Sequence, residues 1–556
     1  MRLVPAALLV CFACTAPETS ADRADALLFA GGTILPLWGA GEDLAQAHES
    51  MVVANGRILA VGSLASLRAR YPDATERDLE GRTVLPGFVD SHAHVHEFGH
   101  DQRKADLTET TTVAEMVERL RLHAPHPDPG AWIVGAGWDE GVWGSLGWPD
   151  RALLDEAFPD NPVVLESLHG FAGFCNGAAL ARAGITAATP HPEGGTIVHR
   201  EDGTPSGVLL TLAQALVNEL VPEETPEETE ASILLGLRTL ARAGVTSVHE
   251  AGLGPARLAA YQRLAAQGRL PIRVYAMLDG NDEDLMESWF TAGPLVDPAG
   301  FLTVRCIKVF YDGSLGSRTA LLREPYADEP HAARPTERIG TEAMQALAER
   351  AAQRGFQVAV HAIGDEGNDR TLSLFERVLA RHPALDHRWR VEHAQVVLPD
   401  FYARAARLGL IASMQPSHAV GDSKWAEARL GPERIRHAYA WRRMRDAGLA
   451  VAFNSDLPGE PWTPLETLYF AVTRQTLDGT PPGGWYAEQS FSVLEALSAM
   501  TRAGAEAAFQ EELLGSLAPG MAADFVELDR NPLEVEPAEL LHLTVHRTWV
   551  AGVSVR

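Results

Sequence analysis

The sequence predicts an α/β protein with a central (β/α)₈, TIM-like barrel, a small β-sandwich built from both termini, and a subdomain inserted into the barrel. Three observations support this fold class. Apolar strand-like runs alternate with helical patterns through the middle of the chain, as is typical of parallel βαβ units. Both ends of the chain hold short strands separated by turn signals. One connection between predicted barrel strands is about 150 residues long, far longer than a single crossover helix.

The composition is that of a globular protein with a large core. The chain has 556 residues, of which 46% are hydrophobic and 22% are charged. A barrel takes roughly 250 residues, so two or three structural units are expected. The formal net charge of −27 would repel nucleic acid, and no basic run reverses it locally. The expected partner is therefore a small-molecule substrate and not nucleic acid. Whether the protein forms an oligomer is left open.

The N-terminus has the layout of a secretory signal. Arg2 precedes a short apolar run, which is well below the roughly 20 residues of a membrane-spanning helix. We assign residues 1–24 to a signal peptide and an N-terminal tail. Cys14 also resembles a bacterial lipoprotein processing site, although Cys11 stands where Leu is usual. A lipid anchor on Cys14 and ordinary cleavage nearby are therefore two alternatives, and both predict an exported bacterial protein, either periplasmic or membrane-anchored.

The two ends of the mature chain are expected to share one small domain. Residues 25–85 alternate short apolar strands with turns, including a hairpin turn at Asn55 and Gly56. Residues 511–556 repeat this style. Because neither segment has enough strands for a stable sheet of its own, we expect the two segments to form one β-sandwich.

Residues 86–510 are assigned to the barrel, with an insertion at about 100–228. Eight strand-like runs begin at residues 87, 245, 272, 304, 356, 389, 410 and 449. The insertion is rich in Gly and aromatic residues. Since it leaves the top of the first strand, we interpret it as a lid and substrate wall, with Trp138 as a substrate contact. Packing of the insertion's own core is the alternative for its tryptophans.

Six polar residues fall at the C-terminal ends of the predicted strands. They are His92 and His94 on the first strand, Lys308 on the fourth, His361 on the fifth, His393 on the sixth and Asp456 on the eighth. These strand ends converge on one face of a barrel, where active sites lie. The paired imidazoles point to the same side, because alternate residues of a strand share a face. Burying all six groups without a metal would be costly, so the set predicts a divalent-metal site.

Five ordered segments resemble the amidohydrolase superfamily, and specifically its YtcJ-like (amidohydrolase 3) branch, related to N-substituted formamide deformylases. The segments are GFVDSHAH, IKVFYDGSLGSRTA, VAVHAIGD, RVEHAQ and NSDLP. The resemblance covers nearly the whole mature chain. It implies that the six residues bind one or two divalent ions, for which we expect zinc. His92, His94 and Asp456 would hold the first ion, and His361 and His393 the second.

The lysine requires a modification to serve as a ligand, because an ammonium group has no lone pair. The resemblance implies that Lys308 is carboxylated to a carbamate, which can bridge two ions. The alternative is an unmodified Lys308 that orients the substrate beside a single ion.

The implied chemistry is metal-assisted hydrolysis with Asp456 as the catalytic proton shuttle. Further substrate contacts are predicted after the fourth and seventh strands. They are Asp312, Ser314, Arg318, His418 and Asp422. Arg318 would receive a carboxylate, or else pair with a neighbouring acid on the surface.

The resemblance indicates hydrolysis of a carbon–nitrogen bond other than a peptide bond, in a small amide, an N-acyl or N-formyl compound or a cyclic amide. A deaminase or an ester hydrolase on the same site is one alternative. A catalytically silent exported binding protein is the other, although the presence of Asp456 argues against it.

Overall fold

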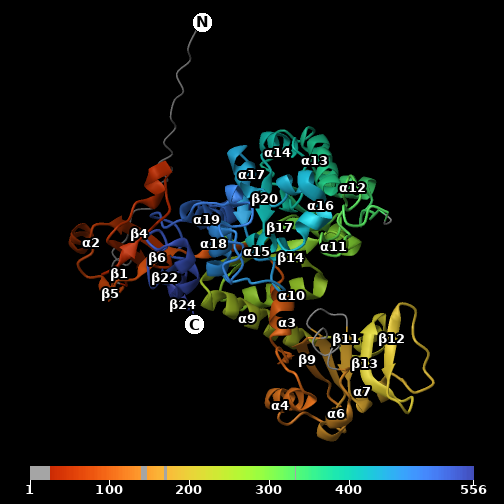
Figure 1. Ribbon diagram of the computed structural model, residues 1–556. Helices are drawn as coiled ribbons and strands as arrows, with labels where there is room; N and C mark the ends of the chain where they lie inside the picture. Colours follow the sequence, from red (N-terminus) through yellow and green to blue (C-terminus); the bar gives the residue numbers. More distant parts are fainter. Residues whose placement is uncertain (1–24, 40, 140–146, 168–171, 332–333, 556) are drawn as a thin grey trace. The chain divides into compact units, whose positions relative to one another are not determined.

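The computed structural model describes residues 25–39, 41–139, 147–167, 172–331 and 334–555 (Figure 1). The predictions made for the signal segment and Cys14 lie outside these residues. The chain divides into two compact units, one of residues 1–95 and 237–556 and one of residues 96–236. Across the described ranges, no helix has the length and apolar character needed to cross a membrane.

The first unit contains the predicted barrel. Its eight strands are parallel and lie in the sheet in the order of the sequence. They are β7 (Phe88–Ala93), β14 (Val245–Leu253), β15 (Arg273–Asp279), β17 (Leu302–Phe310), β18 (Gln357–Ala362), β19 (Arg390–His393), β20 (Ile411–Met414) and β21 (Ala450–Phe453). Each overlaps one of the eight predicted runs. The fold class is confirmed.

Hydrogen bonds between β7, β21 and the residues that follow them close the barrel seam. The Ser91 hydroxyl donates to the Phe453 carbonyl at 3.1 Å. Just beyond the strands, the Asp456 amide donates to the His92 carbonyl at 2.9 Å, and the His94 amide donates to the Leu457 carbonyl at 2.9 Å. The backbone at this seam thereby brings residues of the first and last strands together.

Helices connect the strands and cover the barrel. These helices are α10 (Pro255–Ala266), α11 (Glu283–Ala292), α12 (Thr341–Arg354), α13 (Asp365–Leu379), α14 (Phe401–Leu408), α15 (Pro416–Asp422), α16 (Ala426–Arg434), α17 (Trp441–Asp446), α18 (Pro464–Thr473), α19 (Val493–Ala499) and α20 (Arg502–Ala507). A further helix, α2 (Leu64–Arg70), packs on N-terminal strands outside the barrel. Gly355 ends α12 in a left-handed conformation, with φ of +76°. Because helices shield the sheet, all six residues of β7 are buried and apolar residues dominate the strand interiors.

The first unit holds two further sheets, and the second of them combines strands from both ends of the chain. One contains β1 (Leu27–Ala30), β3 (Ser50–Ala54), β4 (Arg57–Gly62) and β5 (Thr75–Asp78). The other contains β2 (Thr33–Ile34), β6 (Thr83–Pro86), β22 (Phe525–Leu528), β23 (Val545–Val550) and β24 (Val553–Val555). Strand β6 pairs antiparallel with β22. Residues of both sheets share a core in which the Phe29 ring lies 5.1 Å from Phe525 and 5.2 Å from Trp549.

The second unit is an independent sheet with helices. Its strands, in spatial order, are β12 (Gly195–His199), β13 (Pro205–Thr211), β11 (Ala172–Cys175), β10 (Val163–Ser167), β9 (Ile133–Trp138) and β8 (Ala105–Asp106). Its helices include α3 (Val95–Asp101), α4 (Val113–His123), α6 (Ala152–Ala157) and α7 (Gly177–Arg182), and α9 (Pro226–Arg242) leads out of it. The insertion is therefore a small α/β unit with its own apolar clusters, in addition to loops.

One carboxylate joins the two ends of the second unit. Glu224 lies 2.5 Å from Nε2 of His96 and 2.9 Å from Nδ1 of His100, and it accepts hydrogen bonds from Arg103 and Ser232. Gly99 of α3 sits so close to α9 that an added Cβ would lie 1.8 Å from the Ser232 carbonyl oxygen. The segment that enters the unit and the segment that leaves it are thus packed directly on each other.

Candidate metal centre

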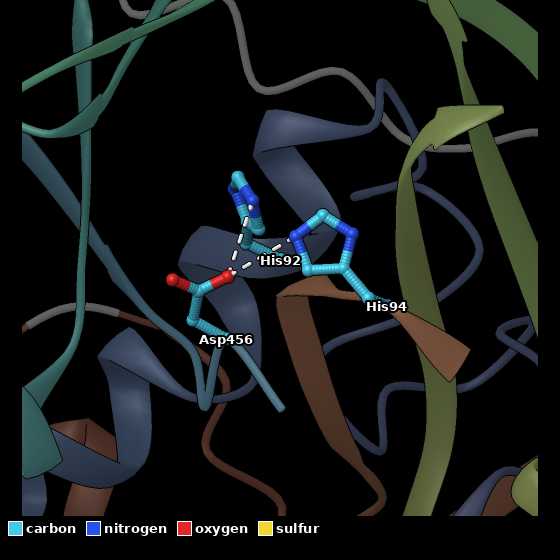
Figure 2. A group of neighbouring side chains, drawn as sticks. All are labelled: His92, His94 and Asp456. Atoms are coloured by element: carbon cyan, nitrogen blue, oxygen red, sulfur yellow. Dashed lines mark ion pairs between the residues drawn. The ribbon is translucent and has the colours of Figure 1, made fainter. Parts of the chain in front are cut away.

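His92, His94 and Asp456 converge at the barrel seam, although the first two are more than 360 residues from the third. Nε2 of His92 lies 3.5 Å from Oδ1 of Asp456, and Nε2 of His94 lies 3.4 Å from the same oxygen (Figure 2). Their ligand atoms all lie within 4.8 Å of one another, so the three side chains are spaced to hold one metal ion. The seam hydrogen bonds at Asp456 and His94 fix this arrangement.

The second carboxylate oxygen of Asp456 faces another pair of imidazoles. Nδ1 of His393 and Nε2 of His418 each lie 3.8 Å from Oδ2. These two histidines and Asp456 form a second group with metal-ligand spacing. His393 and Asp456 both adopt positive φ values, +72° and +53°, which is strained backbone for residues other than glycine.

Lys308 and His361 lie in the same cluster. Nζ of Lys308 is 3.4 Å from Nε2 of His92 and 3.8 Å from the centroid of the Phe310 ring. The His361 ring centroid is 4.4 Å from that of His393, and its Nε2 lies 3.1 Å from the Gly313 carbonyl oxygen. The structure thus brings together all six residues predicted from the sequence as metal ligands. We call His92, His94, Lys308, His361, His393 and Asp456 the ligand cluster.

The protonation states of the ligand cluster fit a divalent cation. Burial, with Lys308 nearby, lowers the pKa of His92 to about 4 and that of His361 to about 3. Burial also lowers the pKa of His393 well below its usual value. Burial alone would raise the pKa of Asp456, but the surrounding imidazoles hold it well below its usual range. For His94, burial lowers the pKa but the contact with Asp456 outweighs it and raises the pKa. Neutral imidazoles at His92, His361 and His393 and an ionised Asp456 are donors that zinc takes.

Burial also changes the lysine. It lowers the pKa of Lys308 to about 8, which makes the neutral amine accessible near neutral pH.

A buried carboxylate that sequence reasoning missed orients His92. Oε2 of Glu392 lies 2.5 Å from Nδ1 of His92, so Nδ1 carries the proton and Nε2 is left with its lone pair facing Asp456. Oε1 of Glu392 is 2.6 Å from Nε of Arg390, whose guanidinium also reaches His249 at 2.8 Å. The sequence run Arg-Val-Glu-His was the signal for this role of Glu392. Charged residues at alternate positions of a buried strand share a face, so they must pair with each other or bind a ligand.

A chain of buried amides connects His393 to the same arginine. Nδ1 of His393 lies 3.0 Å from Oε1 of Gln415, whose amide donates to Asn454 at 2.8 Å. Asn454 donates to the Ser413 hydroxyl, which also accepts from Arg390, both at 2.9 Å. Gln415 and Asn454 follow the seventh and eighth strands directly, and this position was the signal that the sequence offered.

Two of the residues predicted to contact substrate have structural roles instead. The Asp312 carboxylate accepts hydrogen bonds from the amides of Leu321, Ile363 and Gly364 at 2.8–2.9 Å and is fully buried, so it holds neighbouring loops together. The Trp138 indole is fully buried in the core of the second unit, where its Nε1 donates to the Leu165 carbonyl. Each side chain is enclosed by protein in this structure, so a substrate contact by Asp312 or Trp138 has no support here and stays a prediction.

Arg318 and Asp422 are also committed to protein partners. Arg318 pairs with Asp328 at 2.7 Å and Glu329 at 3.1 Å, which is the surface alternative considered for it. Asp422 accepts hydrogen bonds from the Tyr439 hydroxyl and from Gln395, and burial raises its pKa to about 6. Neither is free to receive a substrate in this structure.

The last two predicted contacts have different surroundings. Ser314 is exposed, with its hydroxyl 2.6 Å from that of Ser317, so a substrate contact there stays a prediction. His418 belongs to the second metal-spaced group beside Asp456.

Comparisons with known proteins identify the family of this chain. A family model described as "Amidohydrolase family" matches residues 75–556, and one for an imidazolonepropionase-like composite domain of bacteria matches residues 51–74. The Bacillus subtilis amidohydrolase YtcJ is 31% identical over 512 residues, covering 91% of this chain and 95% of that protein. The N-substituted formamide deformylase of Arthrobacter pascens is 31% identical over 527 residues, covering 91% and 94%.

A solved structure shares the fold. An uncharacterized metal-dependent hydrolase from Pyrococcus furiosus superposes with a TM-score of 0.75 at 29% identity, covering 92% of this chain and all of that one. The family match over most of the length and the shared fold lead to one conclusion: the chain belongs to the amidohydrolase family of hydrolases, on a fold that its relatives use for metal-dependent chemistry.

Proposed function

We propose that the protein hydrolyses a carbon–nitrogen bond other than a peptide bond in a small amide, an N-acyl or N-formyl compound or a cyclic amide. Zinc, as one or two ions held by the ligand cluster, is the proposed cofactor. The observation that carries the proposal is the position of the Asp456 carboxylate, which faces imidazoles through both of its oxygens. A carboxylate in that position combines ligand and base.

A divalent ion held by His92, His94 and Asp456 would activate a water molecule for attack and polarise the substrate carbonyl. Asp456 accepts the proton of the attacking water, because the low pKa of its carboxyl keeps it ionised at neutral pH. It then delivers that proton to the leaving nitrogen. Glu392 holds the His92 proton on Nδ1 throughout.

We further propose that Lys308 carries a carbamate. Its neutral Nζ would add to CO₂ and lose a proton, which converts a buried amine into an anion beside His92. Two facts support this, namely complete burial and the 3.4 Å separation of Nζ from Nε2 of His92. The contact of Nζ with the Phe310 ring favours the alternative, an unmodified ammonium beside a single ion.

The substrate class has its support in one relative. The Arthrobacter pascens protein is named for its action on N-substituted formamides, and it matches this chain over nearly its whole length. Deamination and ester hydrolysis use the same kind of site and are therefore outcomes of the test. A catalytically silent binding protein is the least favoured alternative, because ligand binding alone requires no proton-accepting carboxylate between two pairs of imidazoles.

The test is turnover by the zinc-loaded protein of a panel containing N-substituted formamides, N-acyl amines, cyclic amides, carboxylic esters and aminopurines. We expect hydrolysis of at least one amide class and a loss of about 10²–10⁴-fold in kcat for Asp456→Asn. Turnover of esters or aminopurines alone would replace the proposed reaction class. Tight binding of an amide without turnover would favour the binding protein.

A further inference from the structure

We propose that a groove between α4 and α6 of the second unit binds a second copy of this chain, so that the protein forms a symmetric dimer. The sequence left the oligomeric state open. All residues that line the groove belong to the second unit. The groove shares no residue with the ligand cluster, so the dimer does not depend on the proposed reaction.

The groove has an apolar floor and two exposed leucines. Helices α4 and α6 pack on each other in the second unit (Figure 1), and the depression along them has a volume of about 500 Å³. Ala114, Val117 and Ala157 line it. Leu122 and Leu153 line it as well, with 77% and 46% of their surface exposed. Two exposed leucines in one depression form apolar surface of the kind that a protein partner covers.

Three charged side chains in the groove have no partner in their own subunit. Glu118 and Arg121 lie on α4 and Glu156 lies on α6, and all three are exposed. Within the described part of the chain, none of the three makes a hydrogen bond or an ion pair. Because the groove carries both signs of charge, a purely acidic or purely basic partner would leave one sign unpaired. A second copy of the same groove offers both signs and can neutralise them.

The spacing of residues on α4 fits a two-fold axis. In a symmetric dimer, residue i of one copy contacts residue j of the other, and j contacts i. The groove residues of α4 recur at helical spacing and therefore share one face of the helix, namely Ala114, Val117, Glu118, Arg121 and Leu122.

Two copies of this face are complementary when they cross antiparallel. The pair Glu118 and Arg121 and the pair Val117 and Leu122 have the same midpoint along α4. An axis through that midpoint places Glu118 opposite Arg121 of the partner subunit. The same axis places Val117 opposite Leu122 of the partner subunit. One arrangement thus forms the ion pair and the apolar contact together, and symmetry forms each of them twice.

The test is the mass of the full chain in solution, measured by sedimentation velocity over a series of protein concentrations. We expect the wild type to be a dimer. Leu122→Asp should raise the dissociation constant of the dimer about 30-fold or more, because it removes the most exposed apolar side chain of the groove and adds a charge. Arg121→Glu should also weaken the dimer, since it places like charges opposite each other. Combining Arg121→Glu with Glu118→Arg exchanges the two charges and should recover the dimer.

Leu477→Asp is the matched control, because Leu477 is a leucine of the first unit with 48% of its surface exposed and lies outside the groove. It should remain a dimer. Circular dichroism establishes that each variant is folded. A wild type that is monomeric throughout the series, or a dimer that persists in both Leu122→Asp and Arg121→Glu, would overturn the inference. A charge-exchanged variant that dimerises no better than Arg121→Glu would overturn the antiparallel arrangement.

Discussion

Glu392 and His92 are joined by a contact of 2.5 Å between Oε2 and Nδ1, and both side chains have no exposed surface. Strand β19 and strand β7 supply them, so 300 residues separate the partners in the sequence. The negative charge of Glu392 is balanced by Arg390 at 2.6 Å. The buried Glu392 carboxylate therefore determines which nitrogen of His92 is offered to a metal ion.

Replacing this carboxylate tests its effect on metal binding. We expect Glu392→Gln to weaken zinc affinity by about 10–100-fold, because the amide orients His92 less strongly and lowers its basicity. Competition with a chelating indicator measures this. Glu527→Gln is the matched control: Glu527 is also fully buried, but it accepts from the Trp549 indole in the terminal sandwich. It should lose stability and keep its zinc affinity; equal affinity in both variants would contradict the orienting role.

Carboxylation of Lys308 predicts a dependence on CO₂ and on pH. Because burial lowers the pKa of Lys308 to about 8, the fraction of Lys308 that is present as the reactive neutral amine increases as pH rises from 6 towards 8. Protein freed of metal and CO₂ at low pH should regain metal binding faster at pH 8 than at pH 6 when bicarbonate is added. ¹³C NMR with labelled bicarbonate should show a protein-bound carbamate that Lys308→Met lacks. A carbamate signal of equal intensity in that variant would refute the assignment to this lysine.

The barrel and its ligand cluster were predictable because their signals are local. Each strand is a short apolar run between turn residues, and His92, Lys308 and Asp456 interrupt or end such runs. The C-terminal ends of all barrel strands lie on one face, so the barrel fold alone predicts that these residues lie close together.

Roles that depend on distant partners were not predictable. An aspartate in a Gly-rich loop looks the same whether it binds substrate or, as Asp312 does, three backbone amides. For Trp138 the sequence left a substrate contact and packing of the insertion's own core both open, and only the structure places it in that core. Glu392 and Gln415 occupy positions that the strand pattern marks, but the partners that define their roles, His92 and Asn454, come from other strands.

Glu224 should make the second unit sensitive to acid. Burial raises its pKa, but hydrogen bonds from Ser232, His100 and His96 outweigh burial and lower it from 4.5 to about 2. The folded state therefore binds fewer protons, and the stabilisation is complete above pH about 4.5 and is lost as pH falls towards 2.

At pH 7 we expect Glu224→Gln to destabilise the unit by about 1–3 kcal/mol, and at pH 3 by less. Thermal unfolding at both pH values measures this. Glu219→Gln, at an exposed glutamate, should change little at either pH. A loss of stability in Glu224→Gln that is the same at both pH values would contradict the lowered pKa of Glu224.

The contact between α3 and α9 should tolerate no side chain at Gly99. A Cβ there would lie 1.8 Å from the Ser232 carbonyl oxygen and 2.9 Å from the Gly236 amide nitrogen. Gly99→Ala should therefore force the helices apart and cost about 1–3 kcal/mol or more. Hydrogen exchange should report faster opening of residues 96–236. Gly62→Ala, where a Cβ meets nothing within 4 Å, is the control; unchanged exchange in Gly99→Ala would show that the helices adjust without loss.

Because β6 pairs with β22, this sheet cannot be completed until late in synthesis of the chain. About 440 residues separate these strands, so at roughly 5–20 residues per second the ribosome needs roughly 20–90 s to supply the partner of β6. Throughout that interval the apolar strands around Phe29 and Met51 have no complete core to enter. Until β22 and β23 are synthesised, these strands therefore expose apolar surface of the kind that chaperones bind.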